Sequence, residues 1–169
     1  MFHDREHAAR ELVERLAAYR GRHALVLAIP RGAVPMGRII ADALEGELDV
    51  VLVHKLGAPG NPEFAIGAVD ETGEVFLSRD AQVMGIDQRY IEREAQSQLA
   101  VLRERRERYT PVRPPIDPKD RTVIVVDDGV ATGATFTAAL RAVRSKGPEW
   151  LCAAAAVIAP SSAARLRGE

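Results

Sequence analysis

Two neighbouring acidic residues, Asp127 and Asp128, directly follow the apolar run Val123–Val126. An unbroken β-branched run of this kind predicts a strand that is buried on both faces of a parallel sheet. The acids are followed by a segment of mostly small residues, Gly129–Thr135, and then by apolar residues at helical spacing. The pattern therefore predicts a strand, an acidic pair, a loop and a helix, in that order.

The small-residue loop has the properties of a phosphate-binding site. Amides at the start of a helix have no partner within the helix, and the helix dipole favours an anion there. Thr132 and Thr135 add hydroxyl donors, and Gly133 lets the backbone approach an oxygen closely. Ionised Asp127 and Asp128 only accept hydrogen bonds, which suits a sugar diol or a hydrated metal ion. A phosphate site beside a diol site predicts a ligand of the ribose 5-phosphate type.

Other phosphate-binding patterns fit this stretch less well. No Gly-Lys-Ser/Thr follows, which excludes a P-loop, and a dinucleotide-binding fold would place its acid at the end of the next strand. A phosphoacceptor domain would need a lysine at a later strand end, and the segment Trp150–Pro160 contains none. A helix cap explains one acid, but not two acids followed by Thr-Gly-x-Thr.

A second buried strand is predicted over Ala24–Ile29, and it is followed by Arg31 and Gly32. In an open parallel sheet, ligands bind at the carboxyl ends of the strands. An arginine that caps a turn is the alternative interpretation. Beside the acidic pair, the pattern favours a second anion-binding loop.

A third strand, Leu48–Val53, leads into the segment His54–Pro62. Its density of Gly, Pro and Asn predicts an irregular, mobile loop. Lys55 stands at the strand end, so it shares the predicted sheet edge with Arg31. Both cations could reach a pyrophosphate.

The middle of the chain predicts a β-hairpin within Glu63–Ala81 and a helix from Asp87 to about Tyr109. The basic cluster Arg103–Arg108 is interrupted by glutamates, so we interpret it as a solvated face rather than a nucleic-acid surface. The narrow apolar stripe of this helix is alternatively a contact for a second subunit, which would make a homodimer. A helix is also predicted after Asp4, near the start of the chain.

The stretch Val123–Thr135 resembles the phosphoribosyl-pyrophosphate (PRPP) signature of the type I phosphoribosyltransferases. That signature has four apolar residues, two acids, three variable residues and then Thr-Gly-any-Thr/Ser, and every specified position matches. The resemblance implies an α/β fold with a mostly parallel sheet, helices on both faces and one phosphoribosyltransferase-like domain over residues 1–169. It also implies transfer of 5-phosphoribosyl from PRPP to a nitrogenous base or related amine, with release of pyrophosphate.

The resemblance assigns PRPP binding to residues of all three predicted loops. They are Arg31, Gly32, Lys55, Asp127, Asp128, Gly129, Val130, Ala131, Thr132, Gly133, Ala134 and Thr135. Four of them are predicted to be catalytic: Arg31, Lys55, Asp127 and Asp128. Mg²⁺ is the implied cofactor, held mainly by PRPP and water near the acidic pair, without a dedicated protein cage.

Some positions depart from relatives within that family. The segment Lys55–Gly60 resembles a loop of adenine phosphoribosyltransferases, but His54 replaces an arginine there. Ala131 stands where hypoxanthine-guanine enzymes usually carry an aspartate, which disfavours a 6-oxopurine acceptor. The family usually continues with a further strand and a C-terminal hood over the nucleobase, which we expect to be missing or short here. The alternatives are a PRPP-binding regulatory module, a truncated non-catalytic relative, or another class of α/β phosphate-binding domain.

The bulk properties are those of an ordinary globular protein. The 169 residues are 47% apolar and 28% charged, with a net charge of −1, so there is no bulk bias toward nucleic acid or anionic membranes. We find neither a secretory signal nor an apolar run of membrane-spanning length. We expect a cytoplasmic protein whose partners are PRPP and a small-molecule acceptor, with no nucleic acid and no membrane.

Overall fold

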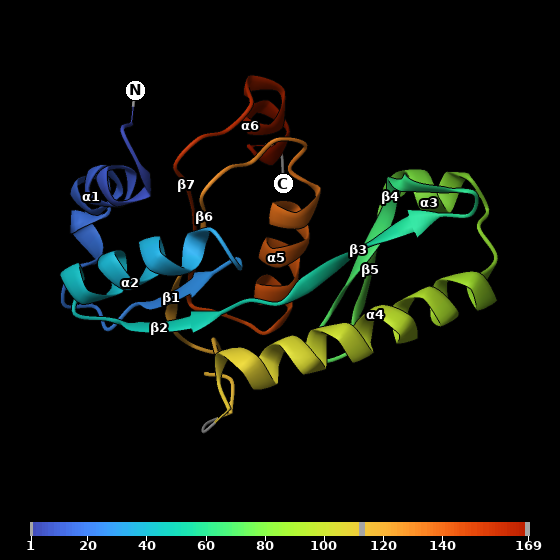
Figure 1. The fold of residues 1–169 in the computed structure, drawn as a ribbon, viewed down its shortest axis with the longest axis horizontal. Helices are drawn as coiled ribbons and strands as arrows, with labels where there is room; N and C mark the ends of the chain where they lie inside the picture. Colours follow the sequence, from blue (N-terminus) through green and yellow to red (C-terminus); the bar gives the residue numbers. More distant parts are fainter. Residues whose placement is uncertain (1, 112–113, 168–169) are drawn as a thin grey trace.

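A parallel sheet with helices on both faces and a smaller antiparallel sheet beside it make up the structure, a computed structural model that describes residues 2–111 and 114–167 (Figure 1). The elements in chain order are α1 (Arg5–Arg15), the 3-10 helix η1 (Ala17–Tyr19), β1 (Leu25–Ala28), α2 (Ala33–Ala43), β2 (Glu47–Val50), β3 (Val53–Ala58), β4 (Asn61–Asp70), β5 (Val75–Leu77), α3 (Arg79–Val83), α4 (Gln88–Tyr109), β6 (Thr122–Asp127), α5 (Ala134–Ser145), β7 (Trp150–Ala155) and α6 (Pro160–Leu166). None of the helices in these described ranges combines the length and apolar character needed to cross a bilayer.

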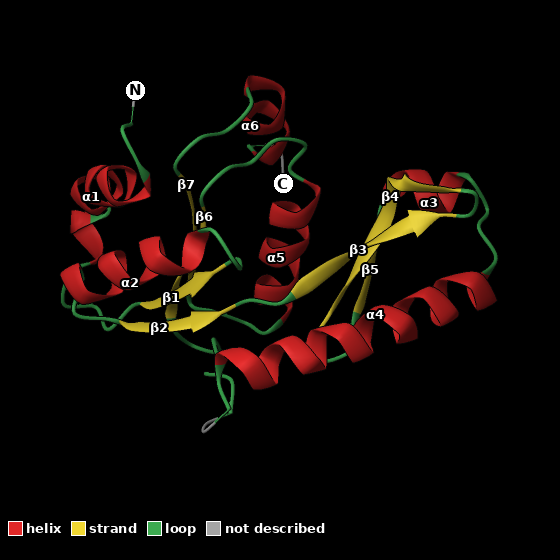
Figure 2. Ribbon diagram, in the orientation of Figure 1, coloured by secondary structure: helices red, strands yellow, loops and turns green. Residues whose placement is uncertain are grey.

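The central sheet has the strand order β2-β1-β6-β7, and all its pairs are parallel. Side chains alternate between its two faces, as the period of a strand requires. Val26 and Ile124 face α1 and α2, whereas Leu25 and Val123 face α5. The apolar runs predicted as doubly buried strands are therefore buried because helices cover both faces, as Figure 2 shows. This confirms the predicted α/β class.

The antiparallel sheet has the order β3-β4-β5 and extends away from the parallel sheet. The prediction of an irregular loop over His54–Pro62 was wrong, because Val53–Ala58 forms β3 and pairs with β4. The Gly and Pro residues mark only the turn and one close approach. Gly60 has a positive φ of 75°, and a Cβ on Gly57 would come within 2.6 Å of Pro62 Cα.

Helix α4 lies along this antiparallel sheet (Figure 1). Its apolar stripe is buried and consists of Ile91, Ala95, Leu99 and Leu102. Three of these residues share a core cluster with Leu56 and Ile66 of the hairpin. The stripe is thus covered within the chain, so the alternative of a subunit contact through it was wrong.

Arg106 ends the same stripe. A solvated face was predicted for it, but its side chain is mostly buried. Its side chain is 12% exposed, and its guanidinium lies between Asp49 of β2 and Glu71 of the β4–β5 turn. One nitrogen donates to Asp49 Oδ1 at 2.8 Å and another to the Val50 carbonyl at 2.9 Å. The other oxygen of Asp49 accepts from the Ile116 amide at 2.8 Å. This buried pairing joins β2, α4, the hairpin turn and the proline-rich connection to β6.

Removal of Arg106 should destabilise the fold, because it would leave the carboxylates of Asp49 and Glu71 without the cation between them. We expect Arg106→Ala to lower the free energy of unfolding by about 3 kcal/mol. Urea unfolding measures this loss. The matched control is Arg103→Ala, an exposed arginine on the same helix, which should change the free energy by less than about 0.5 kcal/mol. Equal losses in the two variants would contradict the structural role of the buried pairing.

Candidate active site

The acidic pair and the arginine–glycine loop meet at one edge of the parallel sheet. Strands β1 and β6 pair in register from Leu25 and Val123 to Ala28 and Val126, so both end at the same level. The chain therefore places Gly32 against Asp128. A Cβ on Gly32 would lie 2.0 Å from Asp128 Oδ2, so a larger residue at this position would displace the Asp128 carboxylate. The peptide bond between Pro30 and Arg31 is cis.

Asp127 carries the strongest electrostatic perturbation of the pair. Burial, opposed by a hydrogen bond from the Gly129 amide and reinforced by the neighbouring charge of Asp128, raises the pKa of Asp127 to about 6. Two adjacent carboxylates at a sheet edge repel each other, so their ionisation is favoured by a nearby cation. The site is thus suited to a ligand that brings hydroxyl donors, a positive charge or both.

Arg5 supplies one such cation, and sequence reasoning missed it. It lies at the start of α1, and its Nε and one terminal nitrogen contact Asp128 Oδ2 at 2.8 and 2.7 Å. The Asp128 side chain is 26% exposed and that of Arg5 is 64% exposed, so the pair is open to solvent. Nothing in the local pattern around Arg5 signals a partner 123 residues away. The contact exists because α1 packs on one face of the parallel sheet, which brings Arg5 to the end of β6, where the acidic pair lies.

The predicted phosphate loop, residues 129–135, is held in place by the segment after β7. The Val130 amide donates to the Val157 carbonyl at 2.8 Å, and its own carbonyl accepts from the Ala159 amide at 3.0 Å. Ser162 of α6 is buried and donates from Oγ to the Ala131 carbonyl at 2.6 Å. No local pattern pointed to this serine, because only the return of the chain after β7 brings it to the loop.

The loop ends in the geometry that a helix N-terminal anion site requires. Gly133 is the N-cap of α5 and adopts the left-handed region, with φ 78°. The Thr137 amide donates to its carbonyl at 2.8 Å, which closes the first turn. Thr132 and Thr135 flank Gly133 and are exposed. A Cβ added to Gly129 would meet no atom of the described residues within 4 Å, so the entrance to the loop is open.

A cavity of about 250 Å³ adjoins this loop. Its walls come from the end of β1, the β2–β3 connection, α4 and the first turn of α5. They comprise Ile29, Pro30, Val51, Leu52, Val53, His54, Lys55, Arg105 and Thr135. Of the predicted site residues, the cavity brings Lys55 and Thr135 together. Arg31 is exposed and does not line the cavity, although its neighbour Pro30 does.

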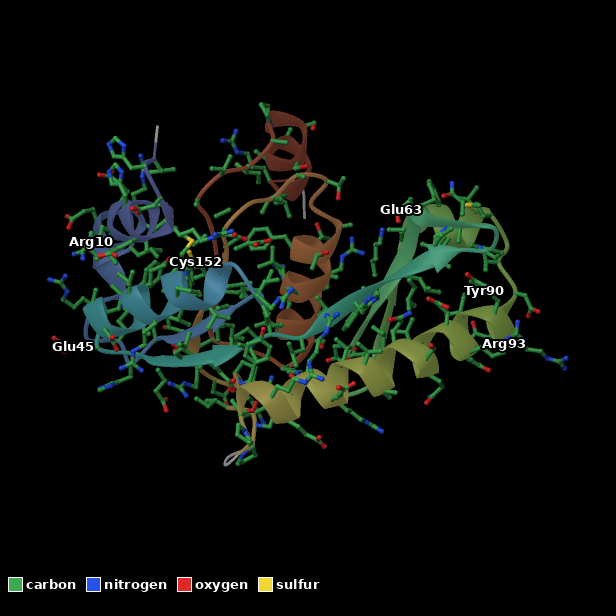
Figure 3. All side chains as sticks on the ribbon, in the orientation of Figure 1. Arg10, Glu45, Glu63, Tyr90, Arg93 and Cys152 are labelled. Carbon is green, nitrogen blue, oxygen red and sulfur yellow. The ribbon has the colours of Figure 1, made fainter. Side chains whose placement is uncertain are left out.

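Lys55 was predicted to stand at the end of a strand, but the structure places it inside one. Lys55 lies within β3, and its Nζ pairs with Glu63 Oε2 at 3.0 Å. Glu63 lies on β4 toward the outer end of the antiparallel sheet, as Figure 3 shows. Its side chain is 88% exposed, so the pair is a weak surface contact from which Lys55 can be withdrawn at little cost.

Arg105 is the second cavity residue that sequence reasoning missed. The sequence predicted a solvated basic cluster, and Arg105 is indeed exposed, but the structure also places it on the cavity wall. A usable signal was present, because Arg105 follows the buried Leu102 by three residues and so lies on the same side of α4. No group of three or more His, Cys, Asp or Glu side chains in residues 2–111 and 114–167 is arranged to hold a metal ion.

The raised pKa of Asp127 predicts a pH dependence of stability. Between about pH 4 and 6 the folded state holds a proton that the unfolded state has lost, so stability falls as the pH rises through this window. After allowance for solvent screening, we expect wild type to lose ~1 kcal/mol relative to Asp127→Asn between the two ends of the window. Urea unfolding at several pH values measures the difference.

The control for that experiment is Asp117→Asn, which alters an exposed carboxylate in the connection before β6, outside the residues assigned to the site. Its profile should parallel that of wild type. A gap between wild type and Asp127→Asn that stays constant with pH would show that Asp127 ionises in its ordinary range.

Comparisons with known proteins show the family to which the chain belongs. The family model of the phosphoribosyl transferase domain matches residues 2–168. A Mycobacterium tuberculosis H37Rv protein named for the phosphoribosyl transferases, Rv0571c, is 38% identical over 170 residues, which is 99% of this chain and 38% of that protein. The chain therefore spans 38% of the length of this curated relative. A ribose-phosphate pyrophosphokinase from Methanopyrus kandleri is 32% identical over 150 residues, covering 76% of this chain and 52% of its own length.

Solved structures give the same result for the fold. The protein TT1426 from Thermus thermophilus is 50% identical, with a TM-score of 0.90 over 99% of this chain and 80% of its own. A hypoxanthine phosphoribosyltransferase from Staphylococcus aureus is 13% identical with a TM-score of 0.55, over 94% of this chain and 65% of its own, and shares the fold. With the family model covering nearly every residue, this chain belongs to the phosphoribosyl transferase domain family.

Proposed function

We propose that this chain is a phosphoribosyltransferase domain that transfers 5-phosphoribosyl from PRPP to a nitrogen acceptor and releases pyrophosphate. The observation that carries the proposal is the meeting of three features at one sheet edge: the acidic pair, the glycine loop at the start of α5, and the Arg31–Gly32 loop packed against Asp128. PRPP carries a monophosphate, a diol and a diphosphate, and these groups match the glycine loop, the acidic pair and the Arg31–Gly32 loop respectively.

Each part of PRPP has a proposed partner. The loop 129–135 receives the 5-phosphate through backbone amides and the hydroxyls of Thr132 and Thr135. Asp127 and Asp128 accept hydrogen bonds from the ribose hydroxyls. Arg31 and Lys55 bind the diphosphate, Arg31 from the loop after β1 and Lys55 from the cavity wall.

The reaction exchanges one bond at the anomeric carbon. The bond from that carbon to the diphosphate oxygen breaks, and a bond to the acceptor nitrogen forms as that nitrogen loses a proton. The leaving group takes both electrons of the broken bond, so charge develops on pyrophosphate and on the ribose ring. The protein contributes by orienting the ribose and by placing cations beside the leaving group.

The residues present fit a hydrated magnesium ion. Asp127 and Asp128 are adjacent carboxylates at the open sheet edge, and the raised pKa of Asp127 means that a nearby positive charge would favour its ionised form. These two residues would hold the water shell of the ion. When bound with PRPP, Mg²⁺ supplies positive charge to the diphosphate.

The direct test is calorimetric titration with PRPP and Mg²⁺, followed by ribose 5-phosphate. We expect both ligands to bind, PRPP more tightly, because only PRPP reaches the cations at the cavity. Failure to bind either ligand would refute the proposal. Release of pyrophosphate with a panel of nitrogenous bases then identifies the acceptor, and Ala131 leads us to expect little activity with 6-oxopurines.

A PRPP-binding module without transfer is the second candidate. Such a module would bind PRPP as above but would release no pyrophosphate with any base. The same two experiments therefore separate the two functions.

Asp128→Asn tests the role proposed for the acidic pair. The substitution keeps the size of the side chain but removes its charge, so we expect affinity for PRPP with Mg²⁺ to fall about tenfold. Thermal unfolding should show a native fold, because the lost pair with Arg5 is exposed. The control is again Asp117→Asn, which should bind as wild type does. Unchanged PRPP affinity in a folded Asp128→Asn variant would remove Asp128 from the binding site.

A further inference from the structure

The buried stripe of α4 ends in two neighbouring arginines with different surroundings. Leu102 is fully buried, and Arg105 and Arg106 follow it by three and four residues, so both lie beside the stripe, Arg106 mostly buried and Arg105 exposed. Arg106 is held between Asp49 and Glu71. Arg105 has no ion pair with any residue that the structure describes.

The contacts of Arg106 fix the side of α4 on which Arg105 lies. Arg106 bonds to two carboxylates and to the Val50 carbonyl, so α4 cannot rotate about its axis without breaking a buried pairing. With the helix fixed, Arg105 lies on the wall of the cavity, opposite the first turn of α5. The fold therefore sets where on α4 Arg105 begins, and its exposed side chain borders the cavity from there.

The cavity itself is suited to an anion. Its lining contains Lys55, Arg105 and His54 but no Asp or Glu of the described residues, and the remaining wall is apolar apart from Thr135. The carboxylate paired with Lys55, Glu63, is highly exposed and does not line the cavity. Cations with few competing acids on an apolar wall attract a phosphate more strongly than they would in bulk water.

We propose that Arg105 binds the diphosphate of PRPP from the cavity wall, together with Lys55. This assignment rests on the proposed function. Thr135, the last residue of the proposed phosphate loop, lies on the same wall, so an anion in the cavity is within the reach of a ligand anchored at that loop. A guanidinium contacts phosphate oxygens through two parallel hydrogen bonds, which orients the group as well as attracting it.

An anionic group of the acceptor is the other source of the same chemistry. The two sources differ in which ligand loses affinity. If the diphosphate is the occupant, Arg105 affects PRPP and inorganic pyrophosphate. If the acceptor is the occupant, Arg105 affects only the Michaelis constant for the acceptor.

The experiment compares Arg105→Gln and Arg105→Lys with wild type in calorimetric titrations. The ligands are PRPP, inorganic pyrophosphate and ribose 5-phosphate, each with Mg²⁺. We expect Arg105→Gln to weaken PRPP and pyrophosphate about tenfold and to leave ribose 5-phosphate within about twofold. Arg105→Lys should recover part of the loss, because it retains the charge without the fork of donors. Arg103→Gln, an exposed arginine of the same helix outside the cavity lining, is the matched control.

Three outcomes would overturn the assignment: unchanged PRPP and pyrophosphate affinity in Arg105→Gln, an equal loss of ribose 5-phosphate affinity, or an effect confined to the acceptor. Failure of the proposed function looks different. Wild type would then bind neither PRPP nor ribose 5-phosphate, while Arg105-dependent binding of pyrophosphate alone would still support an anion site on the cavity wall.

Discussion

The parallel pairing of β1 with β6 is the constraint on which the candidate site depends. Because of their hydrogen-bonded register, both strands end at the same level. The two loops that follow therefore pack against each other, with Gly32 beside the Asp128 side chain. A shift of one residue in this register would move every side chain of β6 to the other face of the sheet. The packing of α1 and α2 on one face and α5 on the other forbids that shift, so the core of the protein sets the geometry of the loops.

A second constraint attaches the antiparallel sheet to the parallel one. After Val50 the chain leaves the parallel sheet and continues into β3, so a cavity forms between the β2–β3 connection, α4 and α5. The buried pairing of Arg106 with Asp49 and Glu71 holds α4 at this junction. A buried ion pair contributes less to stability than its contacts suggest, because both partners lose their hydration. Its stronger effect is on geometry, since it permits one orientation of α4 and of the cavity wall.

Charge balance at the sheet edge is the third feature on which the site depends. Two adjacent carboxylates near the start of α5 would repel an anionic ligand if nothing offset their charge. Arg5 offsets the charge of Asp128, and partial burial raises the pKa of Asp127 to about 6, so its charged form is harder to maintain than that of an exposed aspartate. Both effects come from tertiary neighbours, because α1 supplies the arginine and the surrounding sheet supplies the burial.

The sequence by itself determined the local parts of this protein. The β-branched run Val123–Val126, the acids after it and Gly133 before α5 predicted a strand, a loop and a helix, because period and turn chemistry act over a few residues. Only the tertiary structure decided how these parts combine. The strand β3, the reach of Arg5 to Asp128, the buried Arg106 and the cavity position of Arg105 all depend on packing between distant segments, which no local pattern encodes.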